Sequence, residues 1–281
     1  MDSPWARWNT RLVGARAWKL GCVLLAACVG DTPTNSDSGA DAAVDVASDT
    51  TIDAPPSTWC SKSTHAFCAD FDGVSKPGDG WDSTDVEGTG SLSFDNTVYT
   101  SAPNCLLSAI GAVADAGTAV QAAILARTLQ VTSASPALHT EWDMRVSVGA
   151  TVPAPAVLVL YQVFLNGTSL VQVAVDSVGW YAEVRPGASG GTRNALAATP
   201  SSTSWVHFIL DVTFASTATG SVKLQMTTGD AGATTLIDLK NLQTTTETTA
   251  QTVSIVPGVL EPLYPTPAYQ AHYDDITLDV Q

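Results

Sequence analysis

The segment Trp205-Val206-His207-Phe208-Ile209-Leu210-Asp211-Val212-Thr213-Phe214 decides the fold of this chain. Its apolar side chains occupy every second position from Val206 to Phe214, and this period of two is typical of a strand with one buried face. The run Val222-Lys223-Leu224-Gln225-Met226 repeats the pattern after a turn at Gly220. The two runs therefore predict half-buried strands separated by a turn.

The same character extends over the whole chain from residue 59 onward. Asn166-Gly167 stands between the runs 156–165 and 169–176, and Asn-Gly between two strand-like runs is a strong hairpin signal. Ala112–Ala126 is the one stretch rich enough in alanine to compete as a helix. The other candidate strands are His65–Phe71, Ser91–Tyr99, Asn104–Gly111, Ala119–Val131, His139–Val148, Val178–Arg185, Thr234–Lys240, Thr252–Val256 and His272–Val280.

About a dozen short strands with regular turn signals predict an all-β sandwich. Residues 59–281, roughly 220 residues, are within the size range of one β domain. The 45% apolar content of the 281-residue chain is enough to fill a core. With 27 acidic against 12 basic residues the chain lacks the basic surface that a nucleic-acid backbone requires, so nucleic acid is excluded as a partner.

The N-terminus has the pattern of an export signal. Residues 1–19 contain four basic residues and one acid, and the short apolar run Leu20–Ala27 follows. A spanning helix needs about 20 apolar residues, so this run is too short to stay in a membrane. Leu25-Ala26-Ala27-Cys28 resembles the bacterial lipobox, which implies a signal peptide over residues 1–27 and lipidation of Cys28.

Two alternatives to this interpretation exist. The segment can be an ordinary secretory signal in which Cys28 is incidental, or Cys22 can be the lipidated residue. Lys19 lies three residues before Cys22 and departs from the lipobox pattern. Val29, rather than an aspartate, follows Cys28, and by the same resemblance this favours the outer membrane or the cell surface.

The segment from residue 28 to 58 is expected to be a disordered acidic linker. Six aspartates are spaced along it among Ser, Thr, Ala, Pro and Gly, with no aromatic or basic residue. Such a composition cannot bury enough apolar area to offset chain entropy. We therefore expect a lipid anchor, a self-repelling spacer and then the folded domain.

Four motifs of the domain look like those of the concanavalin A-like, laminin-G-type jelly roll, a domain similar to those of uncharacterised surface lipoproteins of Gram-negative bacteria. They are Phe67-Cys68-Ala69-Asp70-Phe71-Asp72-Gly73 followed by Trp81, Tyr99–Asn104, Ser204–Phe208 and His272–Leu278. The resemblance covers residues 59–281. It implies that the first and last strands lie side by side, which would bring Asp70 and Asp72 near Asp274 and Asp275, and it implies binding of carbohydrate or protein surfaces and sometimes of calcium.

The aspartates are candidates for a structural calcium site. Alternation places Asp274 on the core side with Ile276 and Leu278, where an unpaired carboxylate is costly. Calcium would satisfy it, with Asp70, Asp72 and Asp275 as further ligands. Backbone amides of an adjoining loop would satisfy it equally. The four histidines show no pair at metal-ligand spacing, so zinc is not indicated.

The segment Glu141-Trp142-Asp143-Met144-Arg145-Val146 resembles the catalytic strand motif of jelly-roll glucanases. Glu141 and Asp143 share one face of the strand, but Arg145 and Val146 occupy the positions of the second catalytic Glu. Because the carboxylate pair is incomplete, we expect no enzymatic activity.

Three aromatic residues on or beside strands, Trp142, Trp180 and Tyr181, are candidates for stacking on a sugar. The alternative is that these rings fill the sandwich. Cys60 and Cys68 are the first choice for a disulfide in an exported chain, and Cys68–Cys105 and Cys60–Cys105 are the other pairings.

The sequence as a whole predicts a surface-anchored lipoprotein that displays a non-catalytic module, with an extracellular glycan as the expected ligand. The first alternative is a structural or adhesive module that binds a surface protein. The second alternative is a divergent polysaccharide hydrolase. No cofactor is expected to be required, although a structural Ca²⁺ fits the aspartates.

Overall fold

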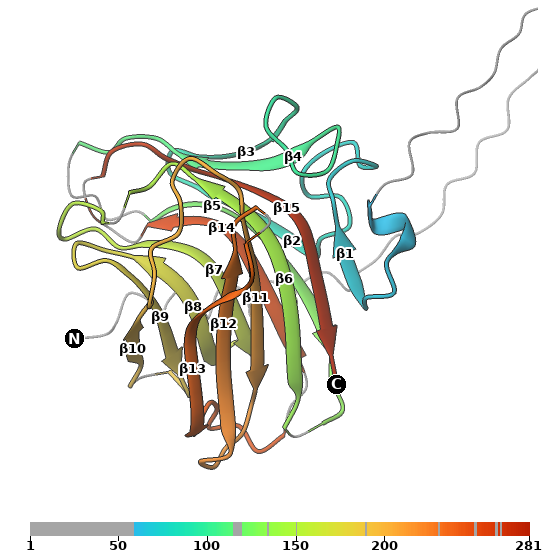
Figure 1. Cartoon of the computed structure of the whole chain (residues 1–281), viewed down its shortest axis with the longest axis vertical. Helices are drawn as coiled ribbons and strands as arrows, with labels where there is room; N and C mark the ends of the chain where they lie inside the picture. Colours follow the sequence, from blue (N-terminus) through green and yellow to red (C-terminus); the bar gives the residue numbers. More distant parts are fainter. Residues whose placement is uncertain are drawn as a thin grey trace, which may run out of the picture.

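In the computed structural model the protein is an all-β sandwich, as the sequence predicts (Figure 1). The structure describes residues 59–114, 120–133, 135–149, 151–188, 190–229, 231–249, 252–261, 264 and 266–281. A short 3₁₀ helix, η1 (Trp59–Lys62), precedes the strands. The strands are β1 (Phe67–Ala69), β2 (Ser83–Glu87), β3 (Gly90–Asp95), β4 (Cys105–Ile110), β5 (Gln121–Gln130), β6 (Ala137–Val146), β7 (Leu158–Leu165), β8 (Ser169–Val175), β9 (Trp180–Arg185), β10 (Thr192–Ala195), β11 (Val206–Thr213), β12 (Gly220–Thr227), β13 (Thr234–Leu242), β14 (Thr252–Glu261) and β15 (Tyr269–Val280).

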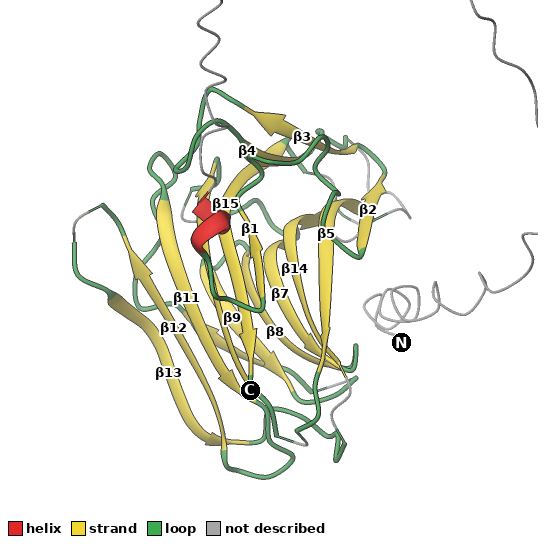
Figure 2. Ribbon diagram, turned by 90° about the vertical axis from the view of Figure 1, so that its right-hand side faces the viewer, coloured by secondary structure: helices red, strands yellow, loops and turns green. Residues whose placement is uncertain are grey.

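The strands form two antiparallel sheets packed face to face (Figure 2). Sheet A has the order β13-β12-β11-β6-β15-β4-β3, with β1 also paired to β15, and sheet B has the order β10-β9-β8-β7-β14-β5-β2. The first strand lies beside the last, as the jelly-roll resemblance implies, with Phe67 opposite Leu278. Sequence-distant strands thus meet at the centre of sheet A, where β6 lies between β11 and β15.

The apolar alternation of β11 points into the space between the sheets. Val206, Phe208, Leu210 and Val212 are buried, while the intervening residues are half-buried on the outer face. Two sheets in this arrangement bury one face each, which is why a period of two in the sequence is sufficient to predict the layer. Strands β7 and β8 are buried on both faces, because a second apolar cluster, which includes Val159, Phe164 and Leu170, packs together on the outer face of sheet B.

The hairpin between β7 and β8 is confirmed. Asn166 and Gly167 have φ angles of 51° and 69°, both in the left-handed region, and they form the centre of a turn in which the Thr168 N–H donates to the Leu165 carbonyl at 3.1 Å. Asn and Gly adopt positive φ more readily than other residues, so this dipeptide fixes the register of two central strands of sheet B.

Two strands differ from the expectation. Strands β2 and β10 are absent from the sequence prediction, and they form the two edges of sheet B. Both are mostly polar, and Val86, the apolar residue of β2, is itself exposed, so they lack the apolar alternation that reveals inner strands. Within the alanine-rich stretch 112–126, residues Gln121–Ala126 belong to strand β5, as the strand predicted over Ala119–Val131 implies and not the competing helix.

The signal peptide, the lipidation site Cys28 and the linker up to residue 58 lie outside the described residues. Their boundaries at residues 27 and 58 therefore stay predictions. Among the residues that the structure does describe, we find no helix with the length and apolar character needed to cross a membrane.

Candidate functional site

Two of the three aromatic residues predicted to bind a sugar belong to the core. Trp142 is completely buried, and its ring stacks on those of Tyr161 and Phe208 at centroid distances of 3.8 and 5.2 Å. Trp180 is buried in the same core, and its Nε1 donates to the carbonyl of Gly149 at 3.0 Å. A ring enclosed on both faces cannot stack on a sugar, so the ligand-binding prediction is wrong for Trp142 and Trp180.

The four predicted calcium ligands lie near one another, but alternation fails for Asp274. Asp274 lies opposite Asp143 in the β15–β6 pairing, and Asp143 is on the outer face. A bulge follows, in which Asp275 has a φ of 49°, and it returns Ile276 to the core. Because one extra residue reverses the alternation, Asp274 points away from the core and not into it.

Asp274 is nevertheless fully buried, because the loop 99–104 covers it. Its Oδ2 accepts from the backbone N–H groups of Thr100 and Ser101, both at 2.9 Å, and its Oδ1 accepts from the hydroxyl of Ser101 at 3.1 Å. Burial raises the pKa of Asp274 to about 6, against the effect of these amides. The loop amides therefore satisfy this carboxylate, which is the alternative to calcium.

Asp70 and Asp72 hold other parts of the same region. Asp70 accepts from the backbone N–H of Cys60 at 2.7 Å, and Asp72 accepts from that of Asn104 at 2.9 Å. Within the described ranges no group of three or more His, Cys, Asp or Glu side chains is arranged to hold a metal ion. The four carboxylates thus fit a role in fixing loops better than a shared metal centre.

Cys60 and Cys68 form a disulfide, the first of the three pairings that the sequence allows. Cys68 lies opposite Thr277 on the outer face of sheet A, so the bond fastens η1 to that face. Cys105 is a buried free cysteine, and its Sγ donates to the carbonyl of Val98. Desolvation raises the pKa of this thiol to about 12, so it stays protonated and unreactive.

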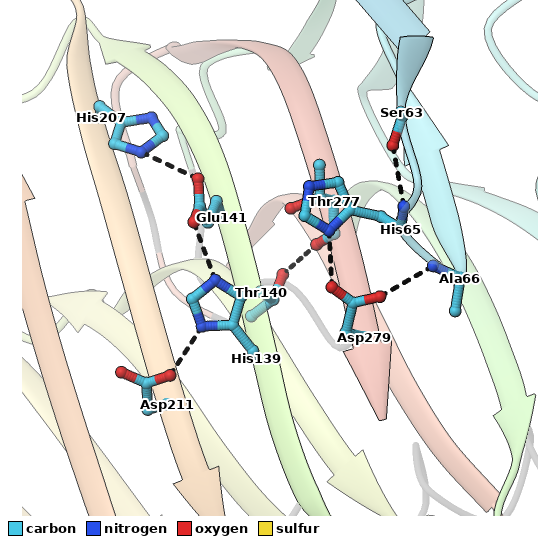
Figure 3. A network of polar contacts seen from close by, with 10 residues as sticks. All are labelled: Ser63, His65, Ala66, His139, Thr140, Glu141, His207, Asp211, Thr277 and Asp279. Carbon is cyan, nitrogen blue, oxygen red and sulfur yellow. Dashed lines mark hydrogen bonds and ion pairs between the residues drawn. The ribbon is translucent and has the colours of Figure 1, made fainter. Parts of the chain in front are cut away.

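The outer face of sheet A carries a chain of alternating carboxylates and imidazoles (Figure 3). His139 donates from Nδ1 to Asp211 at 2.7 Å and from Nε2 to Glu141 at 2.8 Å. His207 lies 3.3 Å from the other oxygen of Glu141, and its Nδ1 is 2.9 Å from Asp143. The glucanase-like pair Glu141 and Asp143 is therefore bonded to histidines and not to a second Glu.

These contacts fix the charges of the chain. The bonds to Asp143 and Glu141 raise the pKa of His207 to about 9. Partial burial acts to lower the pKa of His139, but its two carboxylate partners raise it. The bond from His207 lowers the pKa of Glu141 to about 2. At neutral pH His207 is a cation between carboxylates, so it is not available as a general base.

The outer face of sheet B carries a different arrangement, a row of polar side chains that crosses four adjacent strands. We call Gln162 on β7, Gln172 on β8, Glu183 on β9 and Arg193 on β10 the polar row. Each is directly opposite the next in the strand pairings. Their neighbours along the strands, such as Val163, point into the core, so the row points away from sheet A.

Hydrogen bonds join the inner members of the polar row. Gln162 donates to Gln172 at 3.1 Å, and Gln172 donates to Glu183 at 2.8 Å. Arg185, two residues further along β9, holds the other oxygen of Glu183 through Nη2 at 2.7 Å and Nε at 3.2 Å. Each carboxylate oxygen and amide in the row thus has a defined orientation.

The exposed end of the row is formed by Arg193 with Tyr181. The Arg193 guanidinium lies 3.6 Å from the centroid of the Tyr181 ring and 2.6 Å from Asp176. Nearly half of the Arg193 side chain, 46%, is exposed. Burial raises the pKa of Tyr181 to about 12, and the Arg193 charge acts against this increase. Tyr181, the third predicted aromatic, lies on the outer face of sheet B, where it is 5% exposed and the Arg193 guanidinium covers its ring.

Sequence reasoning missed both the polar row and the histidine chain. Gln162 and Gln172 are single polar residues inside apolar runs, and an unexplained amide in a buried strand is the signal that could have indicated them. His139 and His207 are 68 positions apart (207 − 139) and meet only because β6 pairs with β11. Spacing along the chain carries no information about such a pairing.

Comparison with known proteins identifies the fold but not a family. No family model matches the chain, and no curated protein matches its sequence. An endo-β-1,4-glucuronan lyase from the fungus Trichoderma reesei is similar in structure, with a TM-score of 0.60, 17% identity, and coverage of 77% of this chain and 95% of the lyase. A marine alginate lyase from Aplysia kurodai has a TM-score of 0.56 and 10% identity, covering 77% of this chain and 99% of that one.

The fold therefore defines a jelly-roll β-sandwich of the kind found in polysaccharide lyases. This finding overturns the expectations of a non-catalytic binding module and of a protein without enzymatic activity, because both neighbours are enzymes that degrade polysaccharides. The incomplete glucanase motif was a poor guide, because it tested for one mechanism only.

Proposed function

We propose that the protein is a polysaccharide lyase that cleaves a uronate-containing polymer on the outer face of sheet B. The observation that carries the proposal is the polar row beside Tyr181 and Arg193, in a fold shared with a glucuronan lyase and an alginate lyase. Amide and guanidinium donors are the groups that recognise a sugar carboxylate and its hydroxyls. The outer face of sheet A, in contrast, presents mainly carboxylate groups to such a polymer.

The proposed reaction is a β-elimination. A base removes the proton from the ring carbon next to the carboxylate, the electron pair forms a carbon–carbon double bond, and the bond to the neighbouring glycosidic oxygen breaks. That oxygen takes up a proton and leaves as the new chain end. One proton is lost and one is gained, so no water, metal or redox cofactor is consumed.

Tyr181 is the group proposed to transfer the proton. A tyrosine oxygen can accept the proton from carbon as the phenolate and then return it to the leaving oxygen. Arg193, 3.6 Å from the ring centroid, stabilises the phenolate and presents an exposed guanidinium to the substrate carboxylate. Glu183 and Arg185 act as positioning residues, because they hold each other and Gln172 at the inner part of the row.

The test is release of unsaturated uronate, followed by its ultraviolet absorbance, from glucuronan and alginate. Replacing Tyr181 with Phe keeps the buried ring and removes the hydroxyl, and we expect kcat to fall by about 10²-fold or more. Tyr99→Phe is the matched control, because Tyr99 is an exposed tyrosine outside sheet B. Absence of unsaturated product from both polymers, or full activity of Tyr181→Phe, would refute the proposal.

We also propose that the enzyme is exported and lipid-anchored. The support is the lipobox-like sequence ending at Cys28, the signal-like residues 1–27 and the acidic linker over residues 28–58. A polymer-degrading enzyme must meet its substrate outside the cell, and a spacer of this length gives the domain reach. Structural calcium at the aspartates stays a prediction, which melting curves with and without calcium chloride would test.

A further inference from the structure

A surface pocket of ≈ 570 Å³ lies on the outer face of sheet A, on the side of the sandwich opposite the polar row. It lies between the segment Trp59–His65 and the loop that contains Ser101, and Asp72 is among its lining residues. Its volume is within the range of small-ligand sites. The pocket takes no part in the proposed elimination.

The walls of this pocket are held in place by bonds to sheet A. On one side, the Cys60–Cys68 disulfide and the bond from the Cys60 N–H to Asp70 fix η1. His65 is fixed by Asp279, with Nδ1 2.6 Å from Oδ2 (Figure 3). On the other side, Ser101 donates from its backbone N–H to Asp274 at 2.9 Å. A site whose walls are fixed before binding loses less entropy when a ligand arrives.

One lining group of the pocket lacks a partner. Asp72 Oδ1 accepts from the Asn104 N–H, but Oδ2 is buried and accepts no hydrogen bond among the described residues. Buried carboxylate oxygens in proteins are almost always bonded, so this oxygen indicates a missing donor. Burial also raises the pKa of Asp72, which agrees with a carboxylate short of donors.

The other lining groups indicate which kind of ligand would supply the hydrogen-bond donor that Asp72 lacks. The Trp59 ring is 42% exposed at the pocket, and an exposed indole face packs against the C–H face of a sugar ring. The lining carries one acid, Asp72, and one lysine, Lys62, so no excess of either charge favours an ionic ligand. A neutral sugar offers both an apolar face for Trp59 and hydroxyl donors for Asp72.

We infer that this pocket is an accessory site that binds a neutral sugar residue, with the ring on Trp59 and a hydroxyl donating to Asp72 Oδ2. Such a site would hold the enzyme on a mixed polysaccharide while the face of sheet B remains open to the uronate polymer. The inference does not depend on the lyase proposal, because it concerns a different face and a different class of sugar.

The test is titration calorimetry of the protein with neutral oligosaccharides of glucose, mannose, galactose and xylose. At least one is expected to bind, and Trp59→Ala and Asp72→Asn are each expected to weaken it about tenfold, which equals about 1.4 kcal/mol. The Asn side chain keeps an acceptor for Asn104, so the Asp72 variant retains the loop contact. Tyr264→Ala, an exposed aromatic outside the pocket, is the matched control and should bind normally.

Three outcomes would overturn the inference. They are no binding of any of these oligosaccharides, undiminished binding by both variants, and calcium binding that Asp72→Asn abolishes while sugars have no effect. The Tyr181→Phe variant separates the two proposals, because it should lose elimination and keep neutral-sugar binding. Loss of sugar binding in the Trp59 variant with elimination intact would leave both proposals standing.

Discussion

The negative charge of Asp275 destabilises the native state. This residue lies at the bulge of β15 with a φ of 49°, a region that Asn adopts as readily as Asp. Burial, followed by repulsion from Asp274, raises its pKa to about 7 from the ordinary value of 3.8. The native state therefore binds more protons than the unfolded state between these pH values, and stability falls as pH rises through that range.

We predict that Asp275→Asn stabilises the protein above pH 7 by about 1–3 kcal/mol and has little effect below pH 3.8. Ser101 can still donate its hydroxyl to the amide oxygen of Asn. Thermal melting at several pH values measures the difference. Asp238→Asn, in an exposed pair with Lys240, is the control and should change stability little. Destabilisation at high pH would show that the ionised carboxylate is needed.

The pKa of Tyr181 predicts how the rate of the proposed elimination depends on pH. If the phenolate accepts the proton, a pKa of about 12 means that the active fraction rises about tenfold per pH unit in the range below it. We expect kcat/KM to increase from about pH 7 to 9 on this basis. Arg193→Gln removes the charge that opposes the pKa increase, so its profile should shift to higher pH. A rate that falls over this range would contradict the role as base.

At the scale of elements, the histidine chain joins β6 to β11. The His207 pKa is raised from 6.5 to about 9, so its stabilising contribution is complete below pH 6.5 and is lost as pH rises through about 9. The Glu141 pKa is lowered from 4.5 to about 2, so its contribution is complete above pH 4.5 and is lost as pH falls through about 2. The chain is therefore most stabilising between pH 4.5 and 6.5.

We predict that His207→Gln lowers stability in that window by about 0.2–1 kcal/mol for each lost partner, because the chain is partly exposed. The loss should disappear above about pH 9. A double-mutant cycle with Asp143→Asn, measured by chemical denaturation, isolates the bond between the two side chains. A coupling energy that does not change with pH would contradict the prediction.

Inner strands could be predicted from the sequence, whereas the edge strands of sheet B could not. Inner strands such as β11 are recognised because one face is buried, and burial imposes the apolar period of two. The edge strands β2 and β10 pair on one side only, so their sequences are free to be polar. The bulge at Asp275 is equally invisible, because one added residue leaves the composition of β15 unchanged while it reverses the alternation.

At the scale of the whole molecule, the proposed lipid anchor at Cys28 can be tested directly. We predict that Cys28→Ser releases the protein from the membrane fraction and abolishes its labelling by fatty acid, because acyl chains supply the membrane affinity. Cys22→Ser is the matched control and should leave both unchanged. Fractionation of cells that produce each variant measures the effect. Release by the Cys22 variant instead would move the lipidation site to that residue.

The sequence alone determined the all-β class, the β7–β8 hairpin and most inner strands, because side-chain alternation and turn chemistry act over a few residues. Only the tertiary structure decided that Trp142 is enclosed by the core and that Asp274 is covered by the loop at Thr100. It also placed Gln162, Gln172, Glu183 and Arg193 in one row across sheet B. Strand order depends on contacts between residues far apart in the chain, and no local pattern encodes them.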